Sequence, residues 1–300
     1  MKKQIPRLKR NENLVGWAFV APAMTAFAIL TAFPFLCEMF LSLVEWKFFN
    51  GWKKLKFVGF QNFIDIFSES SDFVMALENT FVYVITIVPL SIILSIIFAY
   101  CMNSRIFGKR WLRMMFFIPY ISSIVAVGTV FKFLFREDGI VNNFLMSLSI
   151  IAEPIKWNID PTFSKIPIIL LSVWMSIGYQ LILFTAAMQN VPVSLYEAGK
   201  IDGASSLKQF TKITLPLISP TIFYLVVTRT MAVFKIFGSV NVFTMGTTMD
   251  SNTSVVVQIY RDAFSSYKFG AASAMAVVLW ILIMIVTAVN FWGQKKWVHY

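Results

Sequence analysis

Six apolar stretches of about 20 residues limit what this chain of 300 residues can fold into. A bilayer core about 30 Å thick needs roughly 20 apolar residues per helix. None of the six stretches contains Asp or Glu, and 58% of the whole chain is hydrophobic, which is too apolar for an ordinary water-soluble domain. The sequence therefore predicts an all-α integral membrane protein with six transmembrane helices. The predicted spans are approximately residues 16–37, 81–101, 115–135, 166–188, 215–238 and 271–293.

Basic residues predict the orientation of these spans, because cytoplasmic segments of membrane proteins carry an excess of Lys and Arg. With a cytoplasmic N-terminus, the inside segments hold 14 Lys or Arg in 61 residues and the outside segments hold 9 in 105. We therefore expect a basic cytoplasmic segment 1–15, a transmembrane domain 16–293 and a cytoplasmic tail 294–300. Both termini then face the cytoplasm, in a multi-pass protein of a cell membrane.

Motifs for catalysis and for ATP binding are absent from the sequence. A phosphate-binding loop of the form GxxxxGK[ST] does not occur, so any ATP that drives this protein must bind to another chain. Two cysteines and a lone histidine, His299, offer neither a Ser–His pair within the predicted bundle nor a metal cluster. The net charge of +11 is not gathered with stacking aromatics on a polar domain, which argues against nucleic acid. We expect no catalytic residue, metal or cofactor on this chain.

The longest predicted cytoplasmic connection, residues 190–216, has the punctuation of a helical hairpin. Pro192 can begin a first helix, Gly203 interrupts it, and Ser205 or Ser206 can cap a second helix. Such an amphipathic hairpin can lie on the lipid interface or bury its apolar side on another protein. The residues that share helix faces are Leu195, Ala198 and Asp202 in the first helix, and Leu207, Phe210 and Ile213 in the second.

The spacing of seven residues in this connection resembles the EAA loop of binding-protein-dependent ABC importers, written EAA-x3-G-x9-I-x-LP. Gly199 stands where Ala is usual, which keeps the surface small and weakens the helix somewhat. The residues that match the motif positions are Glu197, Ala198, Gly199, Gly203, Ile213, Leu215 and Pro216.

Further along the chain, the pattern is similar to that of the carbohydrate-uptake, maltose-type permeases. Asp202 to Ala204, Pro220, Tyr260 to Phe264 and Gly270 to Ala274 all fit that group. The first span, which contains Pro34 and is followed by a long outer loop, looks more like the first of the two permeases that such systems encode. The resemblance covers most of the chain, from about residue 15 to 293.

The resemblance implies a permease subunit of an ATP-driven importer, which translocates a sugar or oligosaccharide delivered by an extracytoplasmic binding protein. It implies a prokaryotic cell membrane and three kinds of partner: a second permease in a heterodimer, two ATPase subunits that hold ATP and magnesium, and the binding protein. In the family, the hairpin docks on the ATPase, and Glu197 would accept hydrogen bonds or pair with a basic residue there, unless it is a solvated helix charge. The expected coupling residues are Glu197, Ala198, Gly199, Asp202, Gly203, Phe210, Ile213, Leu215 and Pro216.

A polar and aromatic stripe crosses the predicted fourth span. Its members lie three or four residues apart, so they share one side of a helix. Hydroxyls beside an aromatic ring suit the mixed polar and apolar faces of a carbohydrate, and maltose-type permeases place sugar contacts on the corresponding face. Small and hydroxyl residues also pack membrane helices together, which is the alternative role. The stripe consists of Ser172, Met175, Ser176 and Tyr179.

Arg229 lies nine residues, or about 13 Å of helix, from the outer end of the predicted fifth span. A charge at this depth is costly, and intramembrane charges usually face a cavity or a partner. We therefore expect Arg229 to line the substrate pathway or to pair with the second permease. An acidic sugar would be a natural ligand for it.

A self-sufficient secondary carrier or channel is the alternative function, since six spans and an intramembrane charge would serve it as well. Such carriers commonly show repeated halves and broken helices at a midplane site. No convincing internal repeat is present in the sequence. The spacing of the 190–216 connection has no obvious use in a carrier of that kind, so the importer permease is the better prediction.

Overall fold

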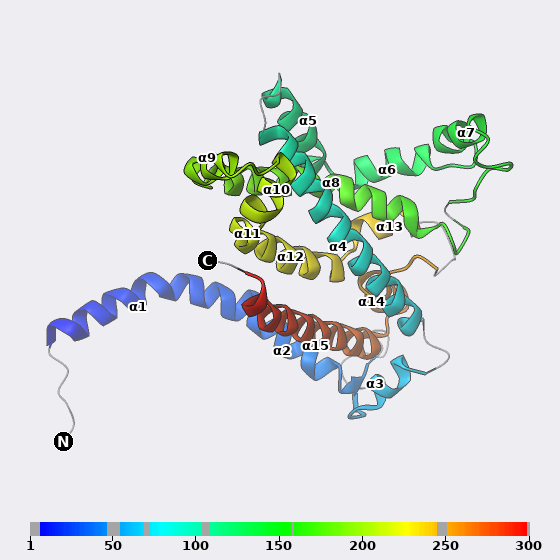
Figure 1. Ribbon diagram of the computed structural model, residues 1–300. Helices are drawn as coiled ribbons and strands as arrows, with labels where there is room; N and C mark the ends of the chain where they lie inside the picture. Colours follow the sequence, from blue (N-terminus) through cyan, green and yellow to red (C-terminus); the bar gives the residue numbers. More distant parts are fainter. Residues whose placement is uncertain are drawn as a thin grey trace. The chain divides into compact units, whose positions relative to one another are not determined.

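The chain is built almost entirely of helices in the computed structural model, which describes residues 7–46, 55–68, 72–103, 108–157, 159–244 and 251–298 (Figure 1). Among these residues, five helical segments are long and apolar enough to cross a membrane: Val15–Leu41, Phe73–Asn103, Lys165–Gln189, Ser219–Thr244 and Phe269–Lys296. A sixth crossing exists if the bent pair Lys109–Ile121 and Ile124–Leu134 counts as one span. The extreme ends of the predicted cytoplasmic segments, residues 1–6 and 299–300 with His299, lie outside the described residues.

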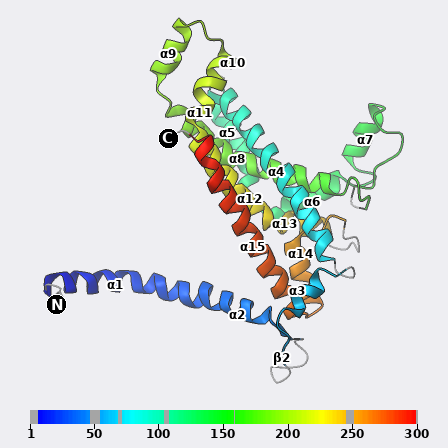
Figure 2. The ribbon, with the colours of Figure 1, turned by 60° about the horizontal axis from the view of Figure 1, so that its bottom comes forward.

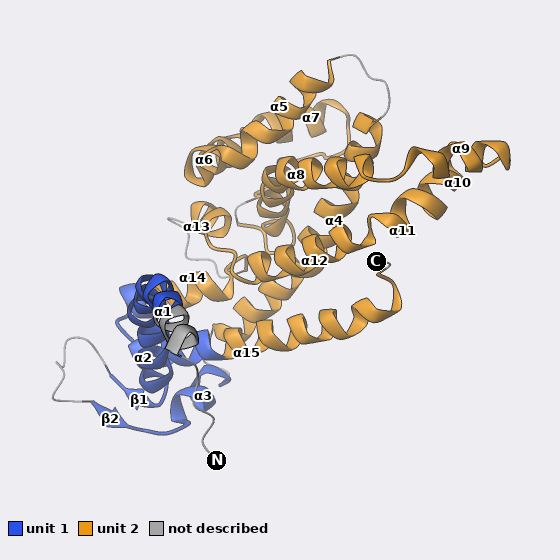
Figure 3. Cartoon of the chain, turned by 90° about the vertical axis from the view of Figure 1, so that its left-hand side faces the viewer, with its two compact units in different colours: residues 1–68, 262–277 blue, residues 69–261, 278–300 orange. Residues whose placement is uncertain are grey.

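Figure 3 colours two compact units, residues 1–68 with 262–277 and residues 69–261 with 278–300. In the first unit, β1 and β2 pair antiparallel, with Val44 opposite Phe57. The side-chain nitrogen of Asn62 donates to the carbonyls of Ser42 at 2.9 Å and Val44 at 3.0 Å, which ties α3 to this strand pair. The unit contains α1 (Arg7–Phe27), the π-helical turn η1 (Ala28–Ala32), α2 (Phe33–Leu41), β1 (Val44–Glu45), β2 (Lys56–Phe57), α3 (Gln61–Ile66), most of the π-helix η5 (Arg261–Ser265) and the start of α15 (Phe269–Gly293).

The second unit is a helical bundle in which α4 lies along α8, α12 packs on α4, and α5 packs on α8. Tyr83 of α4 and Leu171 and Phe184 of α8 are fully buried between them. Small residues allow the helices to approach closely, since a Cβ at Gly178 of α8 would collide with the carbonyl of Phe116. The helices are α4 (Phe73–Asn103), α5 (Lys109–Ile121), α6 (Ile124–Leu134), α7 (Ile140–Ser147), α8 (Lys165–Gln189), α9 (Val193–Ile201), α10 (Ser206–Gln209), η4 (Phe210–Thr214), α11 (Leu215–Leu217), α12 (Ser219–Phe234), α13 (Gly238–Thr244), α14 (Val255–Tyr260), the rest of α15 and η6 (Gln294–Lys296).

The segment before α14 is anchored on α4 by hydrogen bonds from buried polar groups. Tyr83 donates its hydroxyl to the carbonyl of Asn252 at 2.7 Å, and Asn79 donates to the carbonyl of Thr253 at 3.1 Å. Thr80 accepts from the backbone N–H of Val255 at 3.0 Å, at the start of α14. Because polar groups buried in a bundle must be satisfied, these bonds fix where the chain enters α14.

The predicted third span, 115–135, is wrong as a single helix. The chain bends by 99° between α5 and α6, and Ser122 and Ser123 between them have extended backbone with ψ of 153° and 126°. The hydroxyl of Ser122 donates to the carbonyl of Ile118 at 2.7 Å and so replaces a helical backbone bond. Serine side chains compete with the helix for backbone groups, which explains why the helix ends here.

The predicted fifth span, 215–238, is divided as well. Pro220 has no N–H to bond the carbonyl of Pro216, and the helix breaks at Ile218 and begins again as α12 at Ser219. The freed carbonyl of Pro216 instead accepts the hydroxyl of Ser219 at 2.6 Å. At its other end, α12 stops at Phe234, and α13 follows from Gly238.

Candidate functional site: an intramembrane cavity and a helical hairpin

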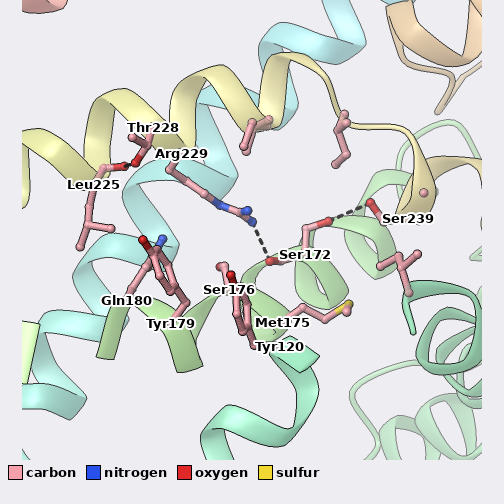
Figure 4. Close-up of a pocket in the computed structure, with 15 residues that line it drawn as sticks. Tyr120, Ser172, Met175, Ser176, Tyr179, Gln180, Leu225, Thr228, Arg229 and Ser239 are labelled. Atoms are coloured by element: carbon pink, nitrogen blue, oxygen red, sulfur yellow. Dashed lines mark hydrogen bonds between the residues drawn. The ribbon is translucent and has the colours of Figure 1, made fainter. Parts of the chain in front are cut away.

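A cavity of about 550 Å³ lies within the second unit and is lined by α5, α6, α8, α12 and α13 and by the connection between the last two (Figure 4). This volume is in the range of small-molecule sites, which are commonly about 300–1,000 Å³. Most of the lining is apolar, with a few polar groups. The lining residues are Tyr120, Ile124, Ser172, Met175, Ser176, Tyr179, Gln180, Leu225, Thr228, Arg229, Ala232, Val233, Ile236, Gly238 and Ser239.

A chain of hydrogen bonds connects α12, α8 and α13 at one side of the cavity. The Nη2 of Arg229 donates to the carbonyl oxygen of Ser172 at 2.8 Å, and the hydroxyl of Ser172 donates to that of Ser239 at 3.1 Å (Figure 4). Arg229 thus extends from α12 toward α8. Its Nε is buried and has no hydrogen-bond partner among the described residues.

Two tyrosines form an aromatic wall of the cavity. The rings of Tyr120 on α5 and Tyr179 on α8 are stacked, with centroids 5.3 Å apart and planes inclined by 16°. Beside them, the hydroxyl of Ser176 donates to the carbonyl of Val173 at 2.8 Å, which leaves its oxygen free to accept. The wall therefore combines flat apolar ring faces with hydroxyl groups, a combination that suits a sugar ring.

Buried polar contacts hold α8 against α4 behind the cavity. Gln180 accepts from the hydroxyl of Ser95 at 2.8 Å and donates from its Nε2 to the hydroxyl of Ser91 at 3.3 Å. All three residues are buried. Satisfied polar networks of this kind rigidify a core, so the wall formed by α8 has a firm support.

The structure brings together all five residues expected from the sequence to line a substrate pathway. Four of them lie on successive turns of α8, and Arg229 faces them from α12. The four residues of α8 are Ser172, Met175, Ser176 and Tyr179. Sequence reasoning missed other lining residues, two on α8 and α12 themselves and two on α5 and α13. Gln180 could have been predicted to face a cavity or a polar partner, because a side-chain amide inside an apolar span is costly. The missed polar and aromatic members are Tyr120, Gln180, Thr228 and Ser239.

Residues 190–217 form a helical hairpin of α9 followed by the run α10, η4 and α11 (Figure 2). Gly203 has a φ of +72°, and no heavy atom lies within 4 Å of the position of a Cβ there. It therefore serves a left-handed turn rather than a close backbone approach. Ser205 is the N-cap of α10, and its side chain accepts from the backbone N–H of Lys208 at 3.4 Å.

Side-chain contacts join the two arms of the hairpin. The hydroxyls of Tyr196 and Thr214 lie 2.9 Å apart, and Gln209 donates to the carbonyl of Ala204 at 3.0 Å. A Cβ at Gly199 would lie 3.2 Å from the Cδ1 of Ile213, so small residues in α9 let the arms pack closely. The hairpin is consequently a defined structural element with its own internal packing.

The outward side of the hairpin carries both charges and apolar side chains. Glu197, Ala198 and Asp202 are exposed. Ile201 is 87% exposed and Leu207 is 72% exposed, and both lie close to the turn in sequence. This exposed surface, defined by Glu197, Asp202, Ile201 and Leu207, is called the hairpin tip below.

Phe210 and Ile213 do not share the exposure of Leu207, although the predicted helix face contained all three. The ring centroids of Phe210 and of Tyr100 in α4 lie 4.4 Å apart, and Ile213 packs toward Gly199. Both are half-buried, as are Leu215 and Pro216. Residues 210–214 form a π-helix, whose extra residue per turn changes which side chains share a face. Phe210, Ile213 and Leu215 pack against the buried core of the bundle and therefore attach the hairpin to it.

A bundle of apolar helices with an internal cavity and a helical hairpin is typical of multi-pass transport permeases, and comparison with known proteins agrees with this class. Residues 91–298 match the family described as the binding-protein-dependent transport system inner membrane component. The chain belongs to this family, and within it to the carbohydrate-uptake ABC transporter permeases.

Named relatives cover nearly the whole chain. It is 34% identical to the lactose transport system permease protein LacF of Rhizobium radiobacter, over 95% of this chain and 94% of LacF. It is 32% identical to the probable ABC transporter permease protein YesP of Bacillus subtilis, over 100% of this chain and 96% of YesP. A chain of the bacterial alginate ABC transporter, solved with an alginate pentasaccharide-bound periplasmic protein, has the same fold with a TM-score of 0.81 at 22% identity, covering 98% of both chains. The predicted family and all-α permease fold are confirmed.

Proposed function

We propose that this chain is the membrane-spanning subunit of an ATP-driven importer, which translocates a sugar or oligosaccharide delivered by an extracytoplasmic binding protein. The observation that carries the proposal is the hairpin of residues 190–217. Its turn depends on Gly203, its arms pack on each other, and its tip exposes carboxylates and large apolar side chains. Such a tip suits docking into a groove of a separate ATPase.

Coupling would follow from how the hairpin is attached. Phe210 contacts Tyr100 of α4, and η4 continues through α11 toward α12, which lines the cavity. A movement of the docked tip is therefore transmitted to cavity-lining helices as a rigid-body displacement. Glu197 and Asp202 are the proposed ionic contacts with the ATPase, and Ala198 and Gly199 keep the surface shallow.

The cavity supplies the proposed pathway. Stacked Tyr120 and Tyr179 and the hydroxyls of Ser172 and Ser176 suit the apolar and polar faces of a sugar. The names of LacF and of the alginate transporter support a carbohydrate cargo. These two names refer to a disaccharide and to an acidic polysaccharide, so together they support a sugar or oligosaccharide as the class of cargo.

The complete importer would contain a second permease, two ATPase subunits and the binding protein, in the cell membrane of a prokaryote. ATP and magnesium would be bound by the ATPase subunits, with no cofactor on this chain. The excess of Lys and Arg in the segments 1–15, 102–114, 189–214 and 294–300 supports cytoplasmic termini and a cytoplasmic hairpin.

Copurification tests this assembly. The tagged chain is extracted from its native membrane with a mild detergent, its partners are identified by mass spectrometry, and the complex is reconstituted into liposomes. We expect an ATPase and a second six-span protein in comparable amounts, and sugar uptake that requires ATP. Recovery of this chain alone, in a form that moves solute without ATP, would replace the proposal with a secondary carrier or channel.

Matched variants test the hairpin tip within the same experiment. Ile201→Asp and Leu207→Asp place a charge in the proposed apolar contact and should release the ATPase from the purified complex. Ile150→Asp is the control, because Ile150 is also strongly exposed, at 63%, but lies in the connection after α7. ATPase retained equally by all three variants would show that the tip is not the docking surface.

A further inference from the structure

Arg229 is the one residue with a formal charge among the fifteen that line the cavity, and no Asp or Glu is among them. The structure gives its guanidinium one hydrogen bond within the described residues, from Nη2 to the carbonyl of Ser172. A guanidinium has five N–H donors, so most of its donors are not used by this bond. A carbonyl dipole is also no counter-charge.

A cation in this position is stabilised by an anion close to it. Charged groups inside a membrane protein are costly unless they are paired or face a watery cavity. The side chains around Arg229 in the cavity are apolar, hydroxyl or amide groups, such as Leu225, Thr228 and Gln180. The described residues that line the cavity therefore leave the positive charge uncompensated.

We infer that Arg229 recognises a carboxylate on the transported saccharide, so that the cargo is a uronic acid-containing sugar. This inference rests on the proposed function. The planar fork of a guanidinium matches a carboxylate with two parallel hydrogen bonds. A carboxylate carries a single charge, which equals that of Arg229, whereas a phosphate monoester carries about −1.5 to −2 at neutral pH and would leave negative charge facing an apolar wall.

The remaining walls complete the site. The stacked Tyr120 and Tyr179 offer ring faces for the apolar side of the sugar, and Ser176 and Ser239 offer hydroxyl oxygens. The bond from Arg229 to Ser172 holds the guanidinium at the boundary of α8 and α12. The carboxylate would bind there, with the ring directed toward the tyrosines.

Matched sugar pairs test this inference in liposomes that contain the complete importer with its binding protein. The probes are disaccharides containing glucuronate, galacturonate or mannuronate, the methyl ester of each, and the neutral sugars maltose and cellobiose. The affinity of the binding protein for each probe is measured separately, so that the uptake rates can be corrected for the selectivity of the binding protein. We expect ATP-dependent uptake of at least one acid to exceed that of its ester by about tenfold or more, the effect of one charge-assisted bond.

Variants assign this preference to Arg229. Arg229→Gln should lower uptake of the acid by about tenfold while uptake of its ester changes little, and Arg229→Lys should retain a preference for the acid. Lys235→Gln is the matched control, because it removes a positive charge from an exposed residue just after α12 that does not line the cavity.

Each contrary outcome has a distinct meaning. Equal uptake of acid and ester by the wild type overturns the inference, even if no variant folds. Undiminished uptake of the acid by Arg229→Gln also overturns it and points to a counter-ion on the second permease. ATP-dependent uptake of maltose or cellobiose without any uronate overturns the inference alone, as does an importer that hydrolyses ATP and takes up no uronate. Uptake of the probes that does not require ATP overturns the proposed function with it.

Discussion

Gly203 determines the turn of the hairpin, because its φ of +72° is a conformation that a β-branched side chain rarely adopts. Gly203→Val should strain or open the turn at a cost of about 1–2 kcal/mol. We expect the reconstituted importer to move less sugar per ATP hydrolysed, since a loosened tip transmits movement poorly. The measurement is the ratio of uptake to phosphate release.

Gly203→Asn is the control for this substitution, since Asn tolerates left-handed backbone far better than Val. Nothing lies within 4 Å of a Cβ at this position, so a difference between the two variants reports on the backbone and not on crowding. A Val variant with the wild-type coupling ratio would contradict this account of the turn.

Tyr179 should contribute to sugar binding through its ring. Tyr179→Ala removes one ring of the stacked pair, whose centroids lie 5.3 Å apart, so the apolar face of the sugar loses a surface to pack on. The KM for uptake should rise about two- to tenfold, which corresponds to about 0.4–1.4 kcal/mol of lost apolar contact. Tyr179→Phe keeps the ring and should stay close to the wild type. If the Phe variant is impaired as much as the Ala variant, the hydroxyl and not the ring makes the important contact.

At the scale of helices, replacing a glycine by alanine should have opposite effects on stability in α8 and in α9. Gly178→Ala directs a methyl group at the backbone carbonyl of Phe116, where α5 and α8 touch, and should destabilise the protein by about 1–3 kcal/mol. Gly199→Ala comes closest to the flexible end of Ile213, at 3.2 Å, and its other neighbours lie at ordinary contact distances of 3.6 and 3.9 Å. Ala is favoured over Gly in a helix by about 1 kcal/mol. Thermal unfolding of the purified variants should therefore rank Gly199→Ala at or above the wild type and Gly178→Ala below it. The reverse order would refute the packing argument.

Regular helices could be predicted from the local sequence pattern, whereas the places where a helix bends or changes its hydrogen bonding could not. The stripe from Ser172 to Tyr179 was visible because α8 is a regular helix, where residues three or four apart share a side. The bend at Ser122 and Ser123 was missed because the span 115–135 is uniformly apolar, and hydrophobicity does not report which backbone bonds form. Phe210 was likewise assigned to the face of Leu207 because a π-helix has no clear sequence signal.

At the scale of the whole molecule, the cavity itself was beyond prediction. The depth of Arg229 in an apolar span predicts that it faces a cavity or a partner. Its position opposite Ser172, however, depends on how α12 packs in the bundle. Tyr120 and Ser239 reach the cavity from α5 and α13, which are distant in sequence from α8. Local periodicity contains no information about such meetings between elements.

The orientation of the chain in the membrane remains a prediction that two exposed positions can test. The excess of basic residues, 14 in 61 against 9 in 105, predicts that Ile201 in the hairpin faces the cytoplasm and that Ile150 after α7 faces outward. Both side chains are well exposed, at 87% and 63%, so a cysteine at either position should be reactive. In a chain with Cys37 and Cys101 replaced by Ser, a membrane-impermeant maleimide should label Ile150→Cys in intact spheroplasts and Ile201→Cys only after permeabilisation. The cysteine-free chain should stay unlabelled, and labelling of Ile201→Cys before permeabilisation would invert the topology and remove the hairpin from reach of a cytoplasmic ATPase.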